Sequence, residues 1–189
     1  MNDPQIRKAF HRSILREEHN DPGTLVLDEL GLKHGKCRAD IAVINGHLNG
    51  FEIKSDKDSL IRLESQIENY SAVFDHASIV IADCHLDKAF CLVPKWWGVI
   101  LVSQDLCSEL EFTVMRLPSQ NANIDDYAVA QLLWREEAQD ALINLGIHGK
   151  KLRETRSNLY RCLVENINSQ DLRLMTREYL KKRQAWRHL

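Results

Sequence analysis

Two short apolar runs joined by a polar turn constrain the fold more than any other part of the chain. The runs cover residues 38–44 and 49–54, and both carry charged residues among aliphatic and aromatic side chains. The connecting segment 45–50 contains Asn-Gly twice, which is the strongest short-range signal for a β-hairpin. The pattern therefore predicts two antiparallel strands that bring acidic residues into a sheet.

Three charged residues of this hairpin are expected to meet on one face. Side chains alternate between the faces of a strand with a rise of about 3.3 Å per residue, so Glu52 and Lys54 share a face. If the two runs pair, Asp40 lies beside Glu52 with about 5 Å between their Cβ atoms. Two carboxylates at that distance repel each other, and a cation between them would offset the repulsion. We therefore expect a divalent-cation site here.

The ligand types indicate which chemistry such a site would serve. Carboxylate oxygens suit Mg²⁺ or Mn²⁺, which keep several waters and also bind the phosphate of a substrate. The metal would acidify a bound water, and Lys54 would orient or deprotonate that water or stabilise the transition state. Asp40, Glu52 and Lys54 are thus candidate catalytic residues, and Asp40 and Glu52 are candidate metal ligands. The alternative is an ordinary pair of exposed strand residues.

Composition and cysteine usage favour a reduced cytoplasmic protein. The chain has 189 residues, 44% of them hydrophobic, which suits one domain with a small appendage. Its apolar runs are too short to span a bilayer, and its first residues lack the features of a signal peptide. Five cysteines without a C-x-x-C pair indicate free thiols. A zinc site at Cys84, His85 and Cys91 would lack a fourth ligand.

Charge is distributed unevenly along the chain. Residues 1–149 hold 14 Lys and Arg against 23 Asp and Glu, whereas residues 150–189 hold 11 against 4. An acidic body with a basic tail is the pattern of a protein that holds a polyanion near a metal site. Lys150, Lys151 and the cluster 181–183 are candidate nucleic-acid contacts. The alternative is that they form solvated helix faces.

Hydrophobic periodicity predicts the order α-β-β-β-α-β for the first part of the chain. We expect a helix over 4–19, strands over 24–30, 38–44, 49–54 and 77–82, and a helix with its apolar stripe over 60–74. A further strand is predicted over 96–102, a polar linker over 121–126, and helices over 128–145, 153–166 and 171–183. The chain thus divides into a core, 1–120, and a basic helical region, 121–189. That region either packs on the core or forms a small subdomain.

This order, with an acid on the second strand and Glu-x-Lys on the third, resembles the PD-(D/E)XK nuclease superfamily over residues 5–82. Four segments look like those of a bacterial and phage family of uncharacterised nuclease-like proteins: Arg38-Ala-Asp-Ile-Ala, Phe51-Glu-Ile-Lys-Ser-Asp-Lys-Asp, Pro94-Lys-Trp-Trp-Gly98 and Leu132-Leu-Trp-Arg-Glu-Glu137. Ala39 stands where the literal motif has proline. The resemblance implies an α/β, restriction-endonuclease-like αβββαβ core with a mixed central sheet. It also implies Mg²⁺- or Mn²⁺-dependent phosphodiester hydrolysis by Asp40, Glu52 and Lys54.

Further residues flank the predicted site. Gln66 and Tyr70 lie four apart on the helix after Glu-x-Lys, which is similar to the third motif of RecB-like nucleases. Gln66 is thus a candidate catalytic residue and Tyr70 a candidate substrate contact, although Tyr70 also fits the apolar core. The resemblance favours Glu29 as a third metal ligand. Arg38 and Arg62 either bind phosphate or pair with nearby acids at 56 and 58.

Three functional hypotheses remain open on the sequence. The first is a metal-dependent nuclease that acts on DNA in preference to RNA. The second is a catalytically silent nuclease-fold module that binds nucleic acid or a protein partner. The third is a structural or regulatory protein whose acids merely decorate its surface. Substrate form, sequence specificity, the number of metals and homodimer formation stay open.

Overall fold

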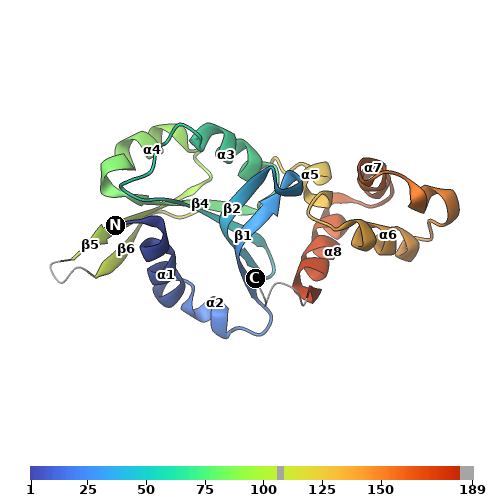
Figure 1. Ribbon diagram of the computed structural model, residues 1–189, viewed down its shortest axis with the longest axis horizontal. Coiled ribbons are helices and arrows are strands. Elements are labelled where there is room, and N and C mark those ends of the chain that lie inside the picture. The colour runs from blue at the N-terminus through green and yellow to red at the C-terminus, as the bar shows by residue number, and fades with distance from the viewer. Residues whose placement is uncertain (106–108, 184–189) are drawn as a thin grey trace.

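The computed structural model, which describes residues 1–105 and 109–183, confirms the predicted α/β class (Figure 1). Its centre is one mixed six-stranded sheet in the order β1-β2-β3-β4-β5-β6. The pairs β1–β2, β2–β3 and β5–β6 are antiparallel, and β3–β4 and β4–β5 are parallel. The strands are β1 Leu25–Leu32, β2 Cys37–Ile44, β3 Leu48–Lys54, β4 His76–Ala82, β5 Gly98–Gln104 and β6 Leu110–Arg116.

Helices account for most of the remaining described chain. The α-helices are α1 Asp3–Ser13, α2 Arg16–Asn20, α3 Leu63–Ser71, α4 Leu86–Leu92, α5 Asp126–Ala130, α6 Arg135–Asn144, α7 Arg156–Asn166 and α8 Ser169–Lys182. Three short 3₁₀ helices join them: η1 Lys33–Gly35, η2 Asp83–His85 and η3 Gly149–Arg153. None of the helices in the described residues is long and apolar enough to cross a membrane.

Two predicted helices are interrupted. The helix expected over 4–19 breaks into α1 and α2, because the amides of both Ile14 and Leu15 bond to the carbonyl of Phe10. The helix expected over 128–145 divides into α5 and α6, because Trp134 is extended (φ −69°, ψ 161°) and begins the second helix. Apolar residues recur at helical spacing across both breaks, so the sequence pattern did not predict them. Helix α4 and strand β6 were not predicted, and β6 lies at the sheet edge with most of its side chains partly or fully exposed.

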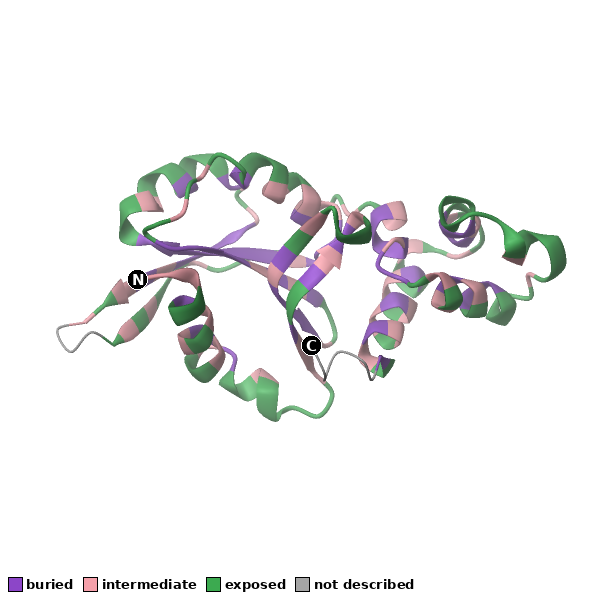
Figure 2. Ribbon diagram, in the orientation of Figure 1, coloured by how far each residue is buried: buried purple, intermediate pink, exposed green. Residues whose placement is uncertain are grey.

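The sheet lies between two apolar layers (Figures 1 and 2). Alternation along β2 places Ile41 and Val43 with Ile6 and Phe10 of α1, and Ala42 and Ile44 with the cluster that includes α3 and α4. Helix α3 packs tightly against the sheet, since a Cβ on Gly50 would lie 2.7 Å from the buried ring of Phe74 just after that helix. The two layers hold β2 and β3 rigidly at the centre of the fold.

The C-terminal helices α5–α8 form a second apolar cluster beside the sheet (Figure 1). Three residues of this region, Ala128 of α5, Leu132 between α5 and α6, and Leu180 of α8, belong instead to the main core cluster. Polar contacts reinforce the junction: the Asn121 side chain donates to the carbonyls of Ser71 (2.7 Å) and Phe74 (3.0 Å). The helical region is therefore packed on the core.

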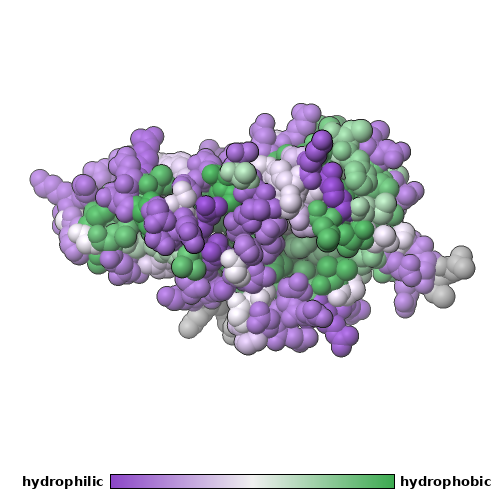
Figure 3. Space-filling view, turned by 180° about the vertical axis from the view of Figure 1, so that it is seen from behind, coloured by the Kyte–Doolittle hydropathy of each residue, from purple (hydrophilic) through white to green (hydrophobic). Residues whose placement is uncertain are grey.

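Hydrophobic side chains gather on the face seen from behind, toward the end that carries the β5–β6 hairpin (Figure 3). Exposed large apolar residues of the elements at this end are Phe90 and Leu92 of α4 and, on or just after β6, Val114, Met115 and Leu117. The guanidinium of Arg116 lies 5.4 Å from the centre of the Phe90 ring, which joins α4 to the edge strand.

Candidate active site

The β2–β3 hairpin places the two predicted acids opposite each other. Ile41 pairs with Phe51, so the same register places Asp40 opposite Glu52. The Asp40 side chain bridges the strands there, because its Oδ2 accepts the amide of Ile53 at 2.7 Å. The hairpin predicted from two Asn-Gly pairs is confirmed.

Glu52 and Lys54 form a buried ion pair. Glu52 is 1% exposed and Lys54 is 5% exposed. Lys54 Nζ lies 2.6 Å from Glu52 Oε1, and Gln66 Nε2 of α3 donates to the same oxygen. The other oxygen, Oε2, is buried and has no hydrogen-bond partner among the described residues. Burial raises the pKa of Glu52, and Lys54 acts against that rise. The unpaired oxygen is a free ligand position in a site that holds its other atoms in place.

Asp40 titrates far from its ordinary range. Burial is the largest cause, and the charge of Glu52 adds to it, so that the pKa of Asp40 rises to about 7. The amide of Ile53 and the guanidinium of Arg7 lower it in part. The charge of Glu52 makes Asp40 harder to ionise, which is an electrostatic arrangement that a nearby cation relieves.

Tyr70 lies inside the core beneath the two acids. Its side chain is fully buried. The hydroxyl accepts the amide of Asp40 (3.0 Å) and donates to the carbonyl of Phe51 (3.2 Å), so it joins β2 to β3. Burial raises the pKa of Tyr70 well above its ordinary value. The expected contact between Tyr70 and substrate is corrected: Tyr70 is a positioning residue, because its ring and hydroxyl are enclosed by the fold.

Arg7 of α1 joins the site, although the sequence did not single it out. Its Nη2 lies 3.4 Å from Asp40 Oδ1 and 3.0 Å from Glu29 Oε1, and its Nη1 donates to the carbonyl of Asp40. The available signal was its position between Ile6 and Phe10, at the border of the buried stripe of α1. Arg7 thus adds a positive charge beside Asp40 that the sequence did not predict.

Glu29 takes a left-handed backbone conformation opposite Asp40. Its φ is 56°, and it lies between the pairs Asp28–Ile41 and Leu30–Ala39. The conformation breaks the alternation expected along β1, at a cost of about 1–3 kcal/mol. The Glu29 carboxylate is bound by Arg7 and by Arg38, whose Nε lies 3.1 Å away.

The predicted three-acid metal set is not assembled. Within residues 1–105 and 109–183, no group of three acidic, histidine or cysteine side chains is arranged to hold a metal. Glu29 faces the same cleft as Asp40, but its oxygens are engaged by two arginines. We therefore restrict the candidate ligands to Asp40 and Glu52.

Asp40 lines a polar cleft of about 510 Å³, whereas Glu52 and Lys54 are buried behind it and are not among the residues of its wall. Asp40 and Gln66 lie in its wall with Arg38, Arg62 and Lys36. Neither Arg38 nor Arg62 pairs with Asp56 or Asp58 in the described part of the chain. Asp56 binds the N-terminal amine, and Asp58 accepts the amide of Ser55. The cleft therefore presents cations beside the acids.

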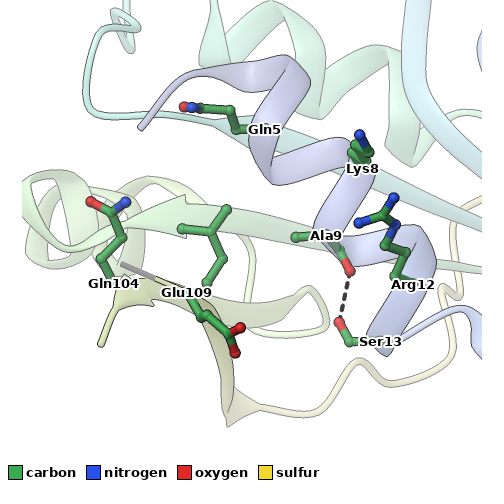
Figure 4. Close-up of a pocket in the computed structure, with 8 residues that line it drawn as sticks. Gln5, Lys8, Ala9, Arg12, Ser13, Gln104 and Glu109 are labelled. Carbon is green, nitrogen blue, oxygen red and sulfur yellow. Dashed lines mark hydrogen bonds between the residues drawn. The ribbon is translucent and has the colours of Figure 1, made fainter. Parts of the chain in front are cut away.

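A second depression lies between α1 and the ends of β5 and β6 (Figure 4). Lys8 and Arg12 lie on its helix side and Glu109 on its strand side. The Ser13 hydroxyl turns away to bond the carbonyl of Ala9 at 2.9 Å. None of the residues of the Asp40–Glu52–Lys54 site lines this depression, so it offers none of that site's chemistry.

The basic residues predicted in the C-terminal region are not in the cleft wall. Lys150 and Lys151 lie in η3, which joins α6 to α7 at the end of the molecule away from the sheet (Figure 1). The Arg183 side chain is buried against Glu137, with Nε 2.7 Å from Oε1. Arg183 therefore holds α8 against α6 and does not extend the basic surface.

Comparison with known proteins assigns the chain to a phage family. The family model of bacteriophage P4 protein cII matches residues 2–188. The chain belongs to the bacteriophage P4 protein cII family. Protein cII of Enterobacteria phage P4 is 30% identical over 122 residues, which are 65% of this chain and 46% of the phage protein. The chain thus aligns with about half of the length of that relative.

A solved structure is also similar to this chain. The SPO1766 protein of unknown function from Silicibacter pomeroyi has 13% sequence identity to this chain and a TM-score of 0.46. The match covers 78% of this chain and 94% of the other.

The donor set of the site fits a hard divalent cation. Asp40 and Glu52 supply carboxylate oxygens, and Glu52 Oε2 is buried without a partner among the described residues. Both pKa values are raised, so both acids would gain from a nearby positive charge. Carboxylate oxygens are the ligands that Mg²⁺ and Mn²⁺ prefer. Arg7 and Lys54 partly balance these charges in the protein itself.

Replacing Asp40 by asparagine is expected to stabilise the metal-free fold at pH 8 and to leave it nearly unchanged at about pH 4. A carboxyl whose folded pKa lies above its unfolded value stabilises the fold while protonated, and this contribution is lost as the pH rises through its folded pKa of about 7. Thermal unfolding between these pH values measures the difference. Asp87→Asn, at an exposed position of α4, is the control. Parallel pH profiles for wild type and Asp40→Asn would refute the assignment.

Proposed function

We propose that this chain is a metal-dependent hydrolase of phosphodiester bonds that acts on DNA in preference to RNA. One observation carries the proposal: Lys54 and Gln66 hold one oxygen of the buried Glu52 and leave the other unpaired, on a residue that lies opposite Asp40 across the β2–β3 hairpin. A fold gains little stability from such an arrangement, since a buried ion pair is often no better than apolar packing. The site resembles that of the PD-(D/E)XK nucleases in residue types and in their order along β2 and β3.

The roles follow from the positions of the side chains. Asp40 and Glu52 would hold Mg²⁺ or Mn²⁺, which when bound acidifies water and neutralises charge on phosphate oxygens. Lys54 donates at Nζ and would orient the attacking water or stabilise the transition state. Gln66 fixes the Glu52 carboxylate, and Tyr70 fixes the spacing of the two strands. Arg38 and Arg62, in the cleft, would bind the flanking phosphates.

A second candidate function is a silent module that binds nucleic acid or a protein partner. The observation that favours it is the charge balance of the site. Arg7 and Lys54 already neutralise much of the charge on Asp40 and Glu52 without a metal. A protein that had lost turnover would be stable in this form, and the arginines of the cleft would still bind an anion.

A cleavage assay paired with metal calorimetry distinguishes the two. The wild type should cut plasmid and linear DNA in Mg²⁺ or Mn²⁺ and not in EDTA. Asp40→Asn and Glu52→Gln should lose both cleavage and metal binding, while Asp87→Asn should keep both. If the wild type binds DNA through Arg38 and Arg62 but neither binds metal nor cuts, the silent module is the correct function.

A further inference from the structure

The β1–β2 turn connects the cleft to the helical region. His34, in η1, stacks on Tyr160 of α7, with ring centres 5.4 Å apart and an interplanar angle of 26°. Tyr160 is itself fixed, because its hydroxyl donates to the carbonyl of Leu133 at 2.8 Å. Gly35 and Lys36, directly after His34, line the cleft. One short turn therefore touches both the candidate active site and the N-terminal half of α7.

Basic side chains lie on both sides of this contact. Burial and the charges of Arg156 and Lys36 lower the pKa of His34, so both cations are close to its ring. Lys36 belongs to the cleft, and Arg156 is the first residue of α7. The stack of His34 on Tyr160 thus links the segment that carries Lys36, in the cleft, to the helix that carries Arg156.

The chain preceding α7 extends this positive surface. Residues 149–164 contain five basic residues and one acid, Glu154. Helix α7 has no acid in its first turn, the position where the helix dipole favours one. Among the described residues, Lys150, Lys151, Arg153 and Arg156 form no ion pairs, and all four side chains are exposed. Such cations are free to meet an anion from outside.

We propose that the cleft continues into a basic track, formed by Lys36, Arg156, Arg153, Lys151 and Lys150, that binds the phosphodiester backbone of a nucleic acid. The inference rests on the proposed function, because the same nucleic acid would pass the Asp40–Glu52–Lys54 site. A polyanion suits the track since Lys150, Lys151, Arg153 and Arg156 follow one another along η3 and the start of α7. Each phosphate contact releases counterions, so the track adds affinity that falls with salt concentration.

Binding measured in EDTA tests the track without cleavage. Fluorescence anisotropy would follow labelled duplex and single-stranded DNA of about 6 and about 24 nucleotides, lengths that differ about fourfold in phosphate count. The variant Lys150→Gln/Lys151→Gln/Arg153→Gln should bind the long DNA at least about 10-fold more weakly and flatten the salt dependence by about 2–3 in log–log slope. Arg156→Gln should act in the same direction. Lys88→Gln/Lys95→Gln, at exposed positions in and just after α4 and outside the cleft wall, is the matched control.

The length dependence separates the track from the active site. The short DNA should bind wild type and triple variant equally, because it fills the cleft alone. Equal salt slopes for the two proteins on the long DNA would overturn the track. Track-dependent binding without any metal-dependent cleavage would instead refute the proposed hydrolase and leave the track standing. Metal-dependent cleavage by the wild type, together with unchanged DNA binding by the triple variant, would refute the track and leave the proposed hydrolase standing.

Discussion

Replacing Lys54 by methionine is expected to lower metal-dependent DNA cleavage by at least about 100-fold, the effect of removing one transition-state contact in a water-excluded site. Lys54 is 5% exposed and its ammonium group lies 2.6 Å from Glu52 Oε1, so no solvent cation can replace it. Methionine retains the length of the aliphatic stem and removes only the charge and its hydrogen bonds. Initial rates in Mg²⁺ and in Mn²⁺ measure the loss.

A structural role for Lys54 must be separated from a catalytic one. Lys54→Met leaves Glu52 buried without its partner, which by itself destabilises the fold. The double variant Lys54→Met/Glu52→Gln removes both charges and should recover most of that stability without recovering cleavage. Lys57→Met, at an exposed lysine three residues on, should cleave normally. Recovery of activity in the double variant, or normal activity of Lys54→Met, would sink the assignment.

Replacing Asp75 by alanine is expected to lower the free energy of unfolding by about 3–5 kcal/mol. The Asp75 carboxylate is buried and joins β3 to α8. Its Oδ2 accepts the amide of Leu48 at the start of β3 (2.7 Å), and its oxygens lie 3.8 Å from Arg173 and 3.4 Å from Arg177 of α8. Alanine would leave that amide and both guanidinium groups without this anion. Urea unfolding measures the change.

The loss should be specific to the junction between sheet and helices. Glu165→Ala, at an exposed acid of α7, should change the stability by less than about 0.5 kcal/mol. Hydrogen exchange should show earlier opening of α8 in Asp75→Ala, because α8 is attached to β3 through that carboxylate. A loss under about 1 kcal/mol would show that the Asp75 carboxylate does not hold the junction, since hydrogen bonds to a charged group contribute more than that.

Local patterns were sufficient for the hairpin and its two acids. Asn-Gly turns and side-chain alternation act over a few residues, so the register that places Asp40 opposite Glu52 follows from short-range rules. The amphipathic stripe likewise predicted α3 and the approach of Gln66 to the strand. Where periodicity ran on without a break, as over 4–19 and 128–145, the same rules missed the interruptions at Leu15 and Trp134.

The sequence by itself determined the α/β class, the hairpin and the identity of its charged residues, because these depend on contacts between near neighbours in the chain. The tertiary structure alone decided how those charges are balanced. Arg7 reaches Asp40 across 33 positions, and Tyr70 reaches it across 30. Two arginines bind the Glu29 carboxylate, which removes Glu29 from the predicted ligands. His34 stacks on Tyr160, which lies far from it in the sequence. Such contacts depend on how whole elements pack, which no local pattern encodes.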